Sequence, residues 1–548
     1  MAIEHDEELP VQRRRNLCSS IRSLGKLMGK DLQYLPAHPG YYRPFFKQLH
    51  PEQCDLTESR IRNIKSDVLF ALRQSGSIQS KGSYMAPLVG EWHKLWETAE
   101  SEKNMRRYCS RLMHYCSAQN IAPGEVNDEV LTVFLQALID ESFVKNPEKT
   151  QRDIIGIWNK LSEGVPAWPS VRLVLPSKRN SYTIPLENFP QSFRDDVAAL
   201  VDHWSGKDIL DETAPMKPLK PRTIKSRLYR LRQIASALVI QGMPIDEITS
   251  LSAFTQVEAA KTALRFYLKR ANDQTTSQVH GLAILIKTLA KHWVCVDEEH
   301  LEKLKELCSR VDPKFKGLTE KNKLRLRQFD DPRNVRLLLN FPQQQVVRIQ
   351  RDDRGLRNQA VAVQIALAVE ILLMAPMRAA NLVNINIERH IQRSRNGQAG
   401  VVHIVIPGSE VKNGDDLEYE LPQETVELLD VYLKHYHPRL ADGDCPWLFP
   451  GKGKGSKTRE LFGDQISKHV FKATGLSINL HLFRHISAKL YLDNNPGGYE
   501  VVRRHLGHRS TETTLRFYSG TEQAAASRHF DATILQLRHG TSSAERAG

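Results

Sequence analysis

Apolar residues recur at helical spacing along most of the chain. One early stripe follows Thr57, a residue type that commonly caps the start of a helix, and consists of Ile61, Ile64, Val68 and Leu72. A second stripe, around Tyr108 to Leu138, is interrupted at a turn-like segment, residues 120–124. This spacing predicts that residues 1–310 are mainly helical.

A basic helix is predicted after a proline-rich segment at 215–221. Thr223 is a candidate N-cap, and Gly242 and Pro244 should end the helix. No acidic residue lies between Pro215 and Gln241, but seven basic ones do: Lys217, Lys220, Arg222, Lys225, Arg227, Arg230 and Arg232. A run of basic residues is usually just the solvated face of a helix. Here the basic residues lie opposite a single apolar stripe, so they also predict a cationic ridge suited to neutralising DNA phosphates.

The pattern changes in the last third of the chain. The apolar run 360–376 is shorter than the roughly 20 residues of a bilayer span and contains Gln364 and Glu370, so it predicts a buried core helix and no membrane association. Segments 401–407 and 416–422 alternate like two strands, and Asn413-Gly414 between them is a hairpin signal. Helical spacing returns from Val426.

The fold class predicted from these patterns is mainly α, with a small antiparallel β-sheet in the last domain. We expect a helical region at 1–80, a helical accessory domain at 85–210 and a further helical domain at 215–312. A polar linker at 313–336, a last domain at 337–535 and a flexible tail at 536–548 should follow.

Composition narrows the class of protein. The 548 residues carry 77 Lys and Arg against 63 Asp and Glu, a net charge of +14, which favours a polyanionic partner. A hydrophobic fraction of 41% excludes a wholly disordered chain. Seven cysteines without a CxxC pair predict reduced thiols, no structural zinc and a cytoplasmic location.

The residues that carry chemistry occur in one order. Arg378 follows the buried helix, Lys412 lies at the hairpin tip, and then come HLFRH (481–485), LGH (506–508) and FYSG (517–520). This series of Arg, Lys, His-x-x-Arg, His and Tyr resembles the tyrosine recombinase, or phage integrase, family. The resemblance covers residues 337–535, and loosely 215–310 as that family's helical core-binding domain.

The resemblance implies a catalytic set of Tyr518, Arg378, Arg484, His481, His508 and Lys412. The roles also follow from chemistry. A phenol is a weak nucleophile, so two guanidiniums should clamp the phosphate oxygens, and a lysine should protonate the leaving oxygen. The ten-residue step from His508 to Tyr518 is one longer than the family's commoner spacing, so the turn after His508 must absorb the extra residue.

Alternatives accompany several of these residues. His481 and His485 lie four apart and could bind a metal, but Leu482 stands where a zinc protease has Glu, so we expect no metal. His485 and His505 are expected to be packing or surface residues. Rivals to Lys412 are Lys434, Lys452 and Lys454. No rival to Tyr518 follows LGH, and Tyr491 and Tyr499, which lie between the two motifs, are expected to be core or surface residues. The segment GKGKGSKT (451–458) fails the spacing of a nucleotide-binding loop, so Lys452 and Lys454 are expected to contact DNA backbone.

The function expected is site-specific DNA recombination or integration for a mobile element, with duplex DNA as substrate, no cofactor and a nucleoid-associated cytoplasmic location. The resemblance implies a tetramer on DNA, with element-encoded accessory proteins as further candidate partners. The C-terminal helix bearing Phe530, Ile534 and Leu537 should dock on a neighbouring copy, or alternatively on its own domain. Type IB topoisomerase-like relaxation and non-catalytic DNA binding are the competing functions.

Overall fold

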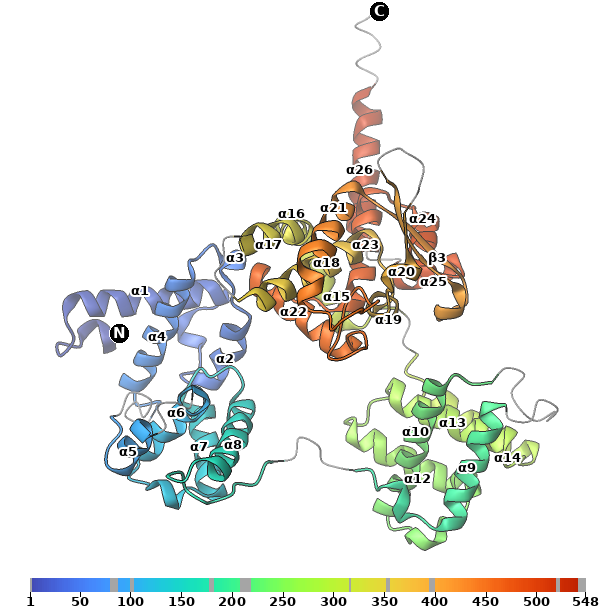
Figure 1. Ribbon diagram of the computed structural model, residues 1–548, viewed down its shortest axis with the longest axis horizontal. Coiled ribbons are helices and arrows are strands. Elements are labelled where there is room, and N and C mark those ends of the chain that lie inside the picture. The colour runs from blue at the N-terminus through green and yellow to red at the C-terminus, as the bar shows by residue number, and fades with distance from the viewer. Residues whose placement is uncertain are drawn as a thin grey trace, which may run out of the picture. The chain divides into compact units, whose positions relative to one another are not determined.

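The fold is described by a computed structural model that covers residues 2–78, 87–98, 103–176, 182–206, 218–314, 317–350, 355–393, 400–518 and 523–540. It is mainly helical with one small antiparallel sheet, as predicted (Figure 1). The chain divides into two compact units. One combines an N-terminal part (Met1–Leu175) with a C-terminal part (Gly317–Gly548), and the other is a middle unit (Pro176–Lys316).

The N-terminal part contains two helical clusters, each with its own apolar core. The first is built from α1 (Val11–Met28), α2 (Pro39–Gln48), α3 (Pro51–Cys54) and α4 (Glu58–Gln74). Thr57 caps α4 as predicted, because its hydroxyl accepts from Arg60 N at 3.2 Å. The second cluster surrounds the buried Trp158 and comprises α5 (Glu91–Thr98), α6 (Lys103–Ala118), α7 (Asp128–Glu141) and α8 (Pro147–Gly164).

The middle unit is helical throughout its described residues. It contains α9 (Gln191–Ser205), α10 (Pro221–Ile240), α11 (Ser252–Thr255), α12 (Val257–Arg270), α13 (Ser277–His292) and α14 (Glu298–Arg310). The domain boundary expected near residue 210 is wrong, because Phe193 and Trp204 of α9 belong to this core. The basic helix also begins earlier than expected: Lys220, not Thr223, is the N-cap of α10, and Pro221 supplies the first helical residue with a preset φ.

The C-terminal part begins before the domain start expected from the sequence. Residues 313–336 were expected to form a linker, but they include α15 (Glu320–Arg327) and the start of α16 (Pro332–Leu339). Leu318, Leu326 and Phe329 are only 3–4% exposed and lie in the main core of this part. The expectation of a linker is therefore wrong. The segment is polar, but its few apolar residues are spaced to face a core.

The central helix is α18 (Leu356–Met374), which follows α17 (Phe341–Gln350) and is buried as predicted. Within the described residues it is the one helix long and apolar enough to cross a membrane by length and composition, yet 67% of its apolar window is buried inside the protein. Its two polar interruptions each make one side-chain hydrogen bond: Gln364 Nε2 donates to Tyr432 Oη at 2.9 Å, and Thr425 Oγ1 donates to Glu370 Oε1 at 2.9 Å. Among the described residues, Gln364 Oε1 and Glu370 Oε2 are buried without a hydrogen-bond partner.

The sheet has the order β1 (Ile391–Arg393), β2 (Val402–Ile406), β3 (Leu417–Leu421), with antiparallel pairing throughout. The predicted hairpin is β2–β3, paired from Val402 opposite Leu421 to Ile406 opposite Leu417. Strand β1 was not predicted, because three residues are too few to show an alternating pattern.

The remaining helices surround this core. They are α19 (Ala379–Val383), α20 (Ile387–His390), α21 (Gln423–Val431), α22 (Arg459–Thr474), α23 (Leu480–Asn494), α24 (Tyr499–Leu506), α25 (Thr511–Tyr518) and α26 (Gln523–Gly540). The flexible tail expected from residue 536 is wrong up to Gly540, because α26 continues to that residue. Residues 541–548 lie outside the described part of the chain.

Candidate active site

Arg378 lies between the central helix and α19. It is the N-cap of α19, and its backbone is extended, with φ −71° and ψ 148°. The side chain is half-buried, and Nη1 donates to Asn413 Oδ1 at 3.0 Å. This bond connects the first predicted arginine to the segment between β2 and β3.

Lys412 is exposed in that segment, next to Asn413. Asn413 Nδ2 donates to Gly507 O at 3.0 Å, and the guanidinium of Arg509 donates to the Asn413 carbonyl. The hairpin tip is therefore held against both Arg378 and the start of the LGH turn. Lys452 and Lys454, two rivals to Lys412, are exposed in the 451–456 turn. A β-bridge between Pro450 and Ser456 closes this turn.

Arg484 connects three segments of the site. It lies on α23 and is 4% exposed. Nη1 donates to Pro376 O at 2.7 Å, and Nη2 donates to Leu506 O at 2.8 Å. Nη2 is also 3.2 Å from His508 Nε2. Burial, followed by the charge of Arg378, lowers the pKa of Arg484, but a guanidinium stays charged near neutral pH.

The tautomer of His508 follows from its neighbours. A guanidinium has only donors, so the Nε2 that faces Arg484 must accept, and the proton lies on Nδ1. Nδ1 then donates to Thr514 Oγ1 at 3.0 Å. Burial first, then Arg484 and Arg378, lowers the pKa of His508 to about 4, so the ring is neutral at pH 7. Gly507 has φ 60° and ends α24, and α25 begins four residues later at Thr511.

Tyr518 is the last residue of α25 and is 1% exposed. Its hydroxyl is 2.9 Å from Nδ1 of His485, which is also buried. Burial raises the pKa of Tyr518 and lowers the pKa of His485 to about 3, so both groups are neutral at pH 7. The phenol in this arrangement is covered and hydrogen-bonded.

His485 is the residue that sequence reasoning undervalued, since it was expected to be a packing or surface histidine. It is buried, but it also contacts the predicted nucleophile. The available signal was its position four residues after His481, on the same helix face. His481 is exposed, its ring centre is 4.9 Å from that of His485, and desolvation followed by Arg484 and Arg378 lowers its pKa. Among the described residues, no group of three or more His, Cys, Asp or Glu could hold a metal.

The two tyrosines between the HLFRH and LGH motifs lie against the same small apolar cluster as Tyr518. Tyr491 and Tyr499 are partly buried there, against a core that includes Leu492, Val502 and Tyr518 itself. The Tyr518 hydroxyl, in the same cluster, contacts His485 of the HLFRH segment.

The predicted DNA-binding residues of α10 fall into two groups within the middle unit. Lys220, Arg222 and Lys225 are exposed near its start. The other three are partly buried and engage their own unit. The Arg227 guanidinium lies 5.0 Å over the Trp204 ring, Arg230 Nη1 donates to Gly281 O at 3.4 Å, and Arg232 Nη2 donates to Thr183 Oγ1 at 3.4 Å. The exposed basic residues of α10 are therefore confined to its start, whereas the sequence pattern predicted a cationic surface along more of the helix.

Comparison with known protein families gives one match. Residues 339–524, about a third of the chain, match the model of the phage integrase family. No curated protein matches the sequence.

Solved structures similar to the chain include recombinases. XerA recombinase shares 17% identity over 62% of this chain and 98% of its own (TM-score 0.24). XerH recombinase bound to palindromic difH substrate shares 14% over 60% and 99% (TM-score 0.29). A lambda integrase dimer bound to a COC′ core site shares 12% over 69% and 87% (TM-score 0.33). These overall similarities are weak, so the assignment rests on the family profile.

Proposed function

We propose that this chain is a site-specific DNA recombinase that cuts and rejoins duplex DNA through a phosphotyrosine intermediate and serves a mobile element. The observation that carries the proposal is the contact of Arg484 with His508, to which Arg378 is connected through Asn413 and its bond to Gly507 O, within the stretch that matches the phage integrase family. Beside it, Tyr518 of α25 and His485 of α23 form a buried pair. Arginines, neutral histidines and a phenol are the groups that phosphoryl transfer to tyrosine requires.

In the proposed cleavage step, Tyr518 Oη attacks the scissile phosphorus. The new Tyr518 O–P bond forms as the P–O5′ bond breaks, and the 5′ oxygen leaves with a proton from a general acid. Arg378 and Arg484 balance the charge that develops on the non-bridging oxygens, because a planar guanidinium can donate two parallel bonds. Rejoining is the reverse attack by a 5′ hydroxyl. The bond energy stays in the phosphotyrosine, so no nucleotide is consumed.

We assign proton transfer to Lys412 and the histidines. Lys412 is exposed beside a turn that is hydrogen-bonded to Arg378, which supports its access to a bound phosphate. His508 and His481 are expected to hydrogen-bond the phosphate or exchange a proton with Tyr518. A neutral histidine can accept the phenol proton, whereas a protonated one cannot.

The covered state of Tyr518 supports a resting form of the enzyme. With 1% exposure, the phenol cannot reach a DNA phosphate without movement of α25. We propose that DNA binding moves α25 and replaces the His485 contact with contact to the scissile phosphate. Cleavage would then be confined to protein already bound at a site.

Assembly on DNA is proposed to use the C-terminal helix. Phe530, Ile534 and Leu537 lie at helical spacing on α26 and are 65%, 40% and 67% exposed. Apolar side chains this exposed on one helix favour docking on a second copy over packing on their own domain. Four protomers on two duplexes, with exposed Lys220, Arg222, Lys225, Lys452 and Lys454 against the backbone, are the proposed complex.

The direct test is a suicide-substrate assay with candidate element-end DNA, in chelator and without ATP. Wild-type protein should form an adduct that survives denaturing gels and maps to Tyr518, and Tyr518→Phe should form none while still binding DNA. Tyr499→Phe is the matched control and should retain the adduct. An adduct on Tyr518→Phe would overturn the assignment.

The same preparation separates the competing functions. Relaxation of supercoiled plasmid without strand exchange between two sites would favour the topoisomerase-like activity. Tight DNA binding with no adduct on any end sequence would favour a non-catalytic DNA-binding protein. Binding itself should weaken steeply with salt in each case and does not discriminate.

A further inference from the structure

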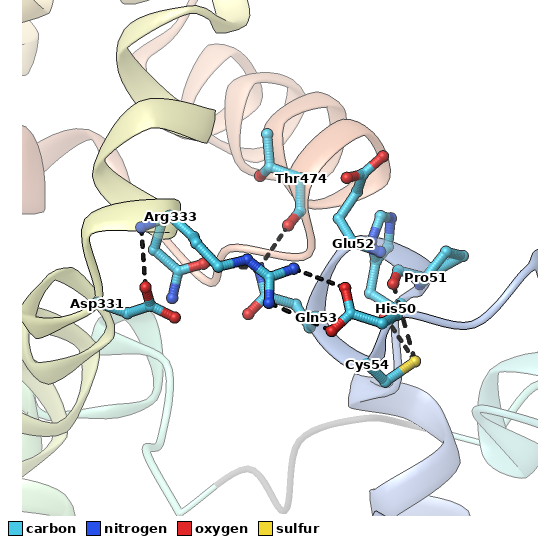
Figure 2. A network of polar contacts seen from close by, with 10 residues as sticks. His50, Pro51, Glu52, Gln53, Cys54, Asp331, Arg333 and Thr474 are labelled. Atoms are coloured by element: carbon cyan, nitrogen blue, oxygen red, sulfur yellow. Dashed lines mark hydrogen bonds and ion pairs between the residues drawn. The ribbon is translucent and has the colours of Figure 1, made fainter.

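A polar contact joins the N-terminal part to the C-terminal part inside their common unit (Figure 2). It is made by residues 50–55, which include α3 and which we call the docking segment. Arg333, in the first turn of α16, makes two bonds to Asp55: Nη2 to Oδ1 at 2.8 Å and Nη1 to Oδ2 at 3.3 Å. This fork lowers the pKa of Asp55 through hydrogen bonding and charge.

The docking segment also caps a helix of the other part. The last carbonyls of any α-helix have no partner within the helix. At the end of α22, His50 Nε2 donates to Lys472 O at 3.0 Å, and Gln53 Nε2 donates to Thr474 O at 2.8 Å. The partners of these carbonyls thus come from residues more than 400 positions earlier.

Gly475 shows that the fit is close. It ends α22 with φ 75°, a region that favours glycine. A Cβ there would lie 2.6 Å from Gln53 Cγ and 2.8 Å from His50 Cβ, well inside van der Waals contact. The His50 ring also packs edge-on against Phe471, with ring centres 5.9 Å apart. The end of α22 is therefore shaped to receive the docking segment.

A series of hydrogen bonds connects this contact to α23, the candidate catalytic helix. Gln53 Nε2 also donates to Asn334 Oδ1 at 2.9 Å, and Asn334 Nδ2 donates to Gln328 O at 2.8 Å. The Gln328 side chain accepts from Ser477 N at 2.9 Å and donates to Ser477 O at 3.3 Å. Ser477 lies two residues before Asn479, the N-cap of α23.

A second connection reaches α23 from the same turn. The buried Lys489 donates to Asp330, which lies just before α16, at 2.8 Å. Residues 328–334 thus contact the docking segment on one side and, on the other, Ser477 just before α23 and Lys489 in the second half of α23. That helix carries His481, Arg484 and His485.

We propose that the end of α22 and the start of α16 form a docking surface for residues 50–55 of the same chain, and that docking holds α23 in the arrangement needed for cleavage. The N-terminal part thereby acts as a positioning element for the catalytic helix. Its effect on cleavage rests on the function proposed above, whereas its effect on the order of residues 475–482 does not.

The primary test is hydrogen–deuterium exchange of the full-length protein without DNA. Asp55→Arg and Arg333→Asp should each speed exchange at 475–482 by about two- to ten-fold, the range for losing one net hydrogen bond, and the double variant should restore slow exchange. Glu58→Arg is the matched control, because it makes the same charge change on an exposed residue whose ion pair, with Arg62, lies within α4. Unchanged exchange at 475–482 in both single variants would overturn the proposal.

A second pair of variants tests the fit independently of charge. Gly475→Ala should release the docking segment. Gly29→Ala is the control, because Gly29 has a similar φ of 62° and a Cβ added there would meet no atom within 4 Å. Only Gly475→Ala should speed exchange at 475–482, and equal effects would count against docking. Adduct formation is measured in parallel and should fall with undocking. Wild-type protein that forms no adduct but shows the expected exchange pattern would refute the proposed function and leave docking intact.

Discussion

Replacing Arg484 by lysine should destabilise the C-terminal part and also slow DNA cleavage. The two terminal nitrogens of Arg484 donate to different carbonyls, those of Pro376 and Leu506. Lysine has one terminal nitrogen, which cannot occupy both donor positions. At least one carbonyl at a side chain only 4% exposed would therefore lose its donor.

The magnitude follows from that lost bond. A buried carbonyl without a partner costs about 1–3 kcal/mol. In a domain of roughly 200 residues each kcal/mol shifts Tm by about 2–4 °C, so Arg484→Lys should melt about 2–12 °C below the wild type. Adduct formation should also fall by about 10²–10³, as for other donors that stabilise a developing charge.

Thermal melting of the full chain and single-turnover adduct formation measure the two effects separately. Arg378→Lys should lose a similar factor in adduct formation with a smaller change in Tm, because Arg378 is half-buried and bonds an amide side chain. Arg504→Lys, on an exposed arginine paired with Glu500, is the matched control and should behave like the wild type. Arg484→Lys that melts with the wild type would refute the reasoning.

Three further predictions concern other groups of the C-terminal part. Lys412→Ala should abolish cleavage of a normal phosphodiester but spare a substrate with a 5′-bridging sulfur, because a thiolate leaves without a proton; equal loss on both substrates would remove Lys412 as the acid. Burial depresses the pKa values of His485 (about 3) and His508 (about 4), so both rings add stability above pH 6.5 that is lost as the pH falls toward 4 and 3. Thermal melting should therefore show a Tm that declines from pH 7 to pH 4, and this decline should be shallower in His508→Asn. Phe530→Ser should reduce sedimentation of multi-protomer complexes on DNA without weakening binding of a single protomer, and an unchanged distribution would contradict docking through α26.

The sequence predicted those parts of the fold that local patterns determine. Asn413-Gly414 and the alternation on each side were enough to predict the β2–β3 hairpin, because turn type and register are local properties. The order of Arg378, His481, Arg484, His508 and Tyr518 likewise predicted a family domain that the profile match supports.

The parts that were wrong depend on contacts distant in sequence. Residues 318–329 have the composition of a linker, and only the core they meet shows why Leu326 and Phe329 are apolar. The role of His485 depends on the position of α25, and the contacts of the docking segment depend on residues more than 270 positions away. No local pattern encodes these pairings.

The separation between His50 and Lys472 affects how the protein is made. The two residues are 422 positions apart, so at synthesis rates of about 5–20 residues per second His50 is made roughly 20–85 s before its partner. During this interval the N-terminal helices and the whole middle unit can fold, but α22 does not yet exist to receive the docking segment. A nascent or truncated chain that ends before Gly475 lacks the receiving surface. Docking is therefore among the last contacts to form during synthesis. A chain that extends past Gly475 can make the His50–Lys472 contact, and a shorter one cannot.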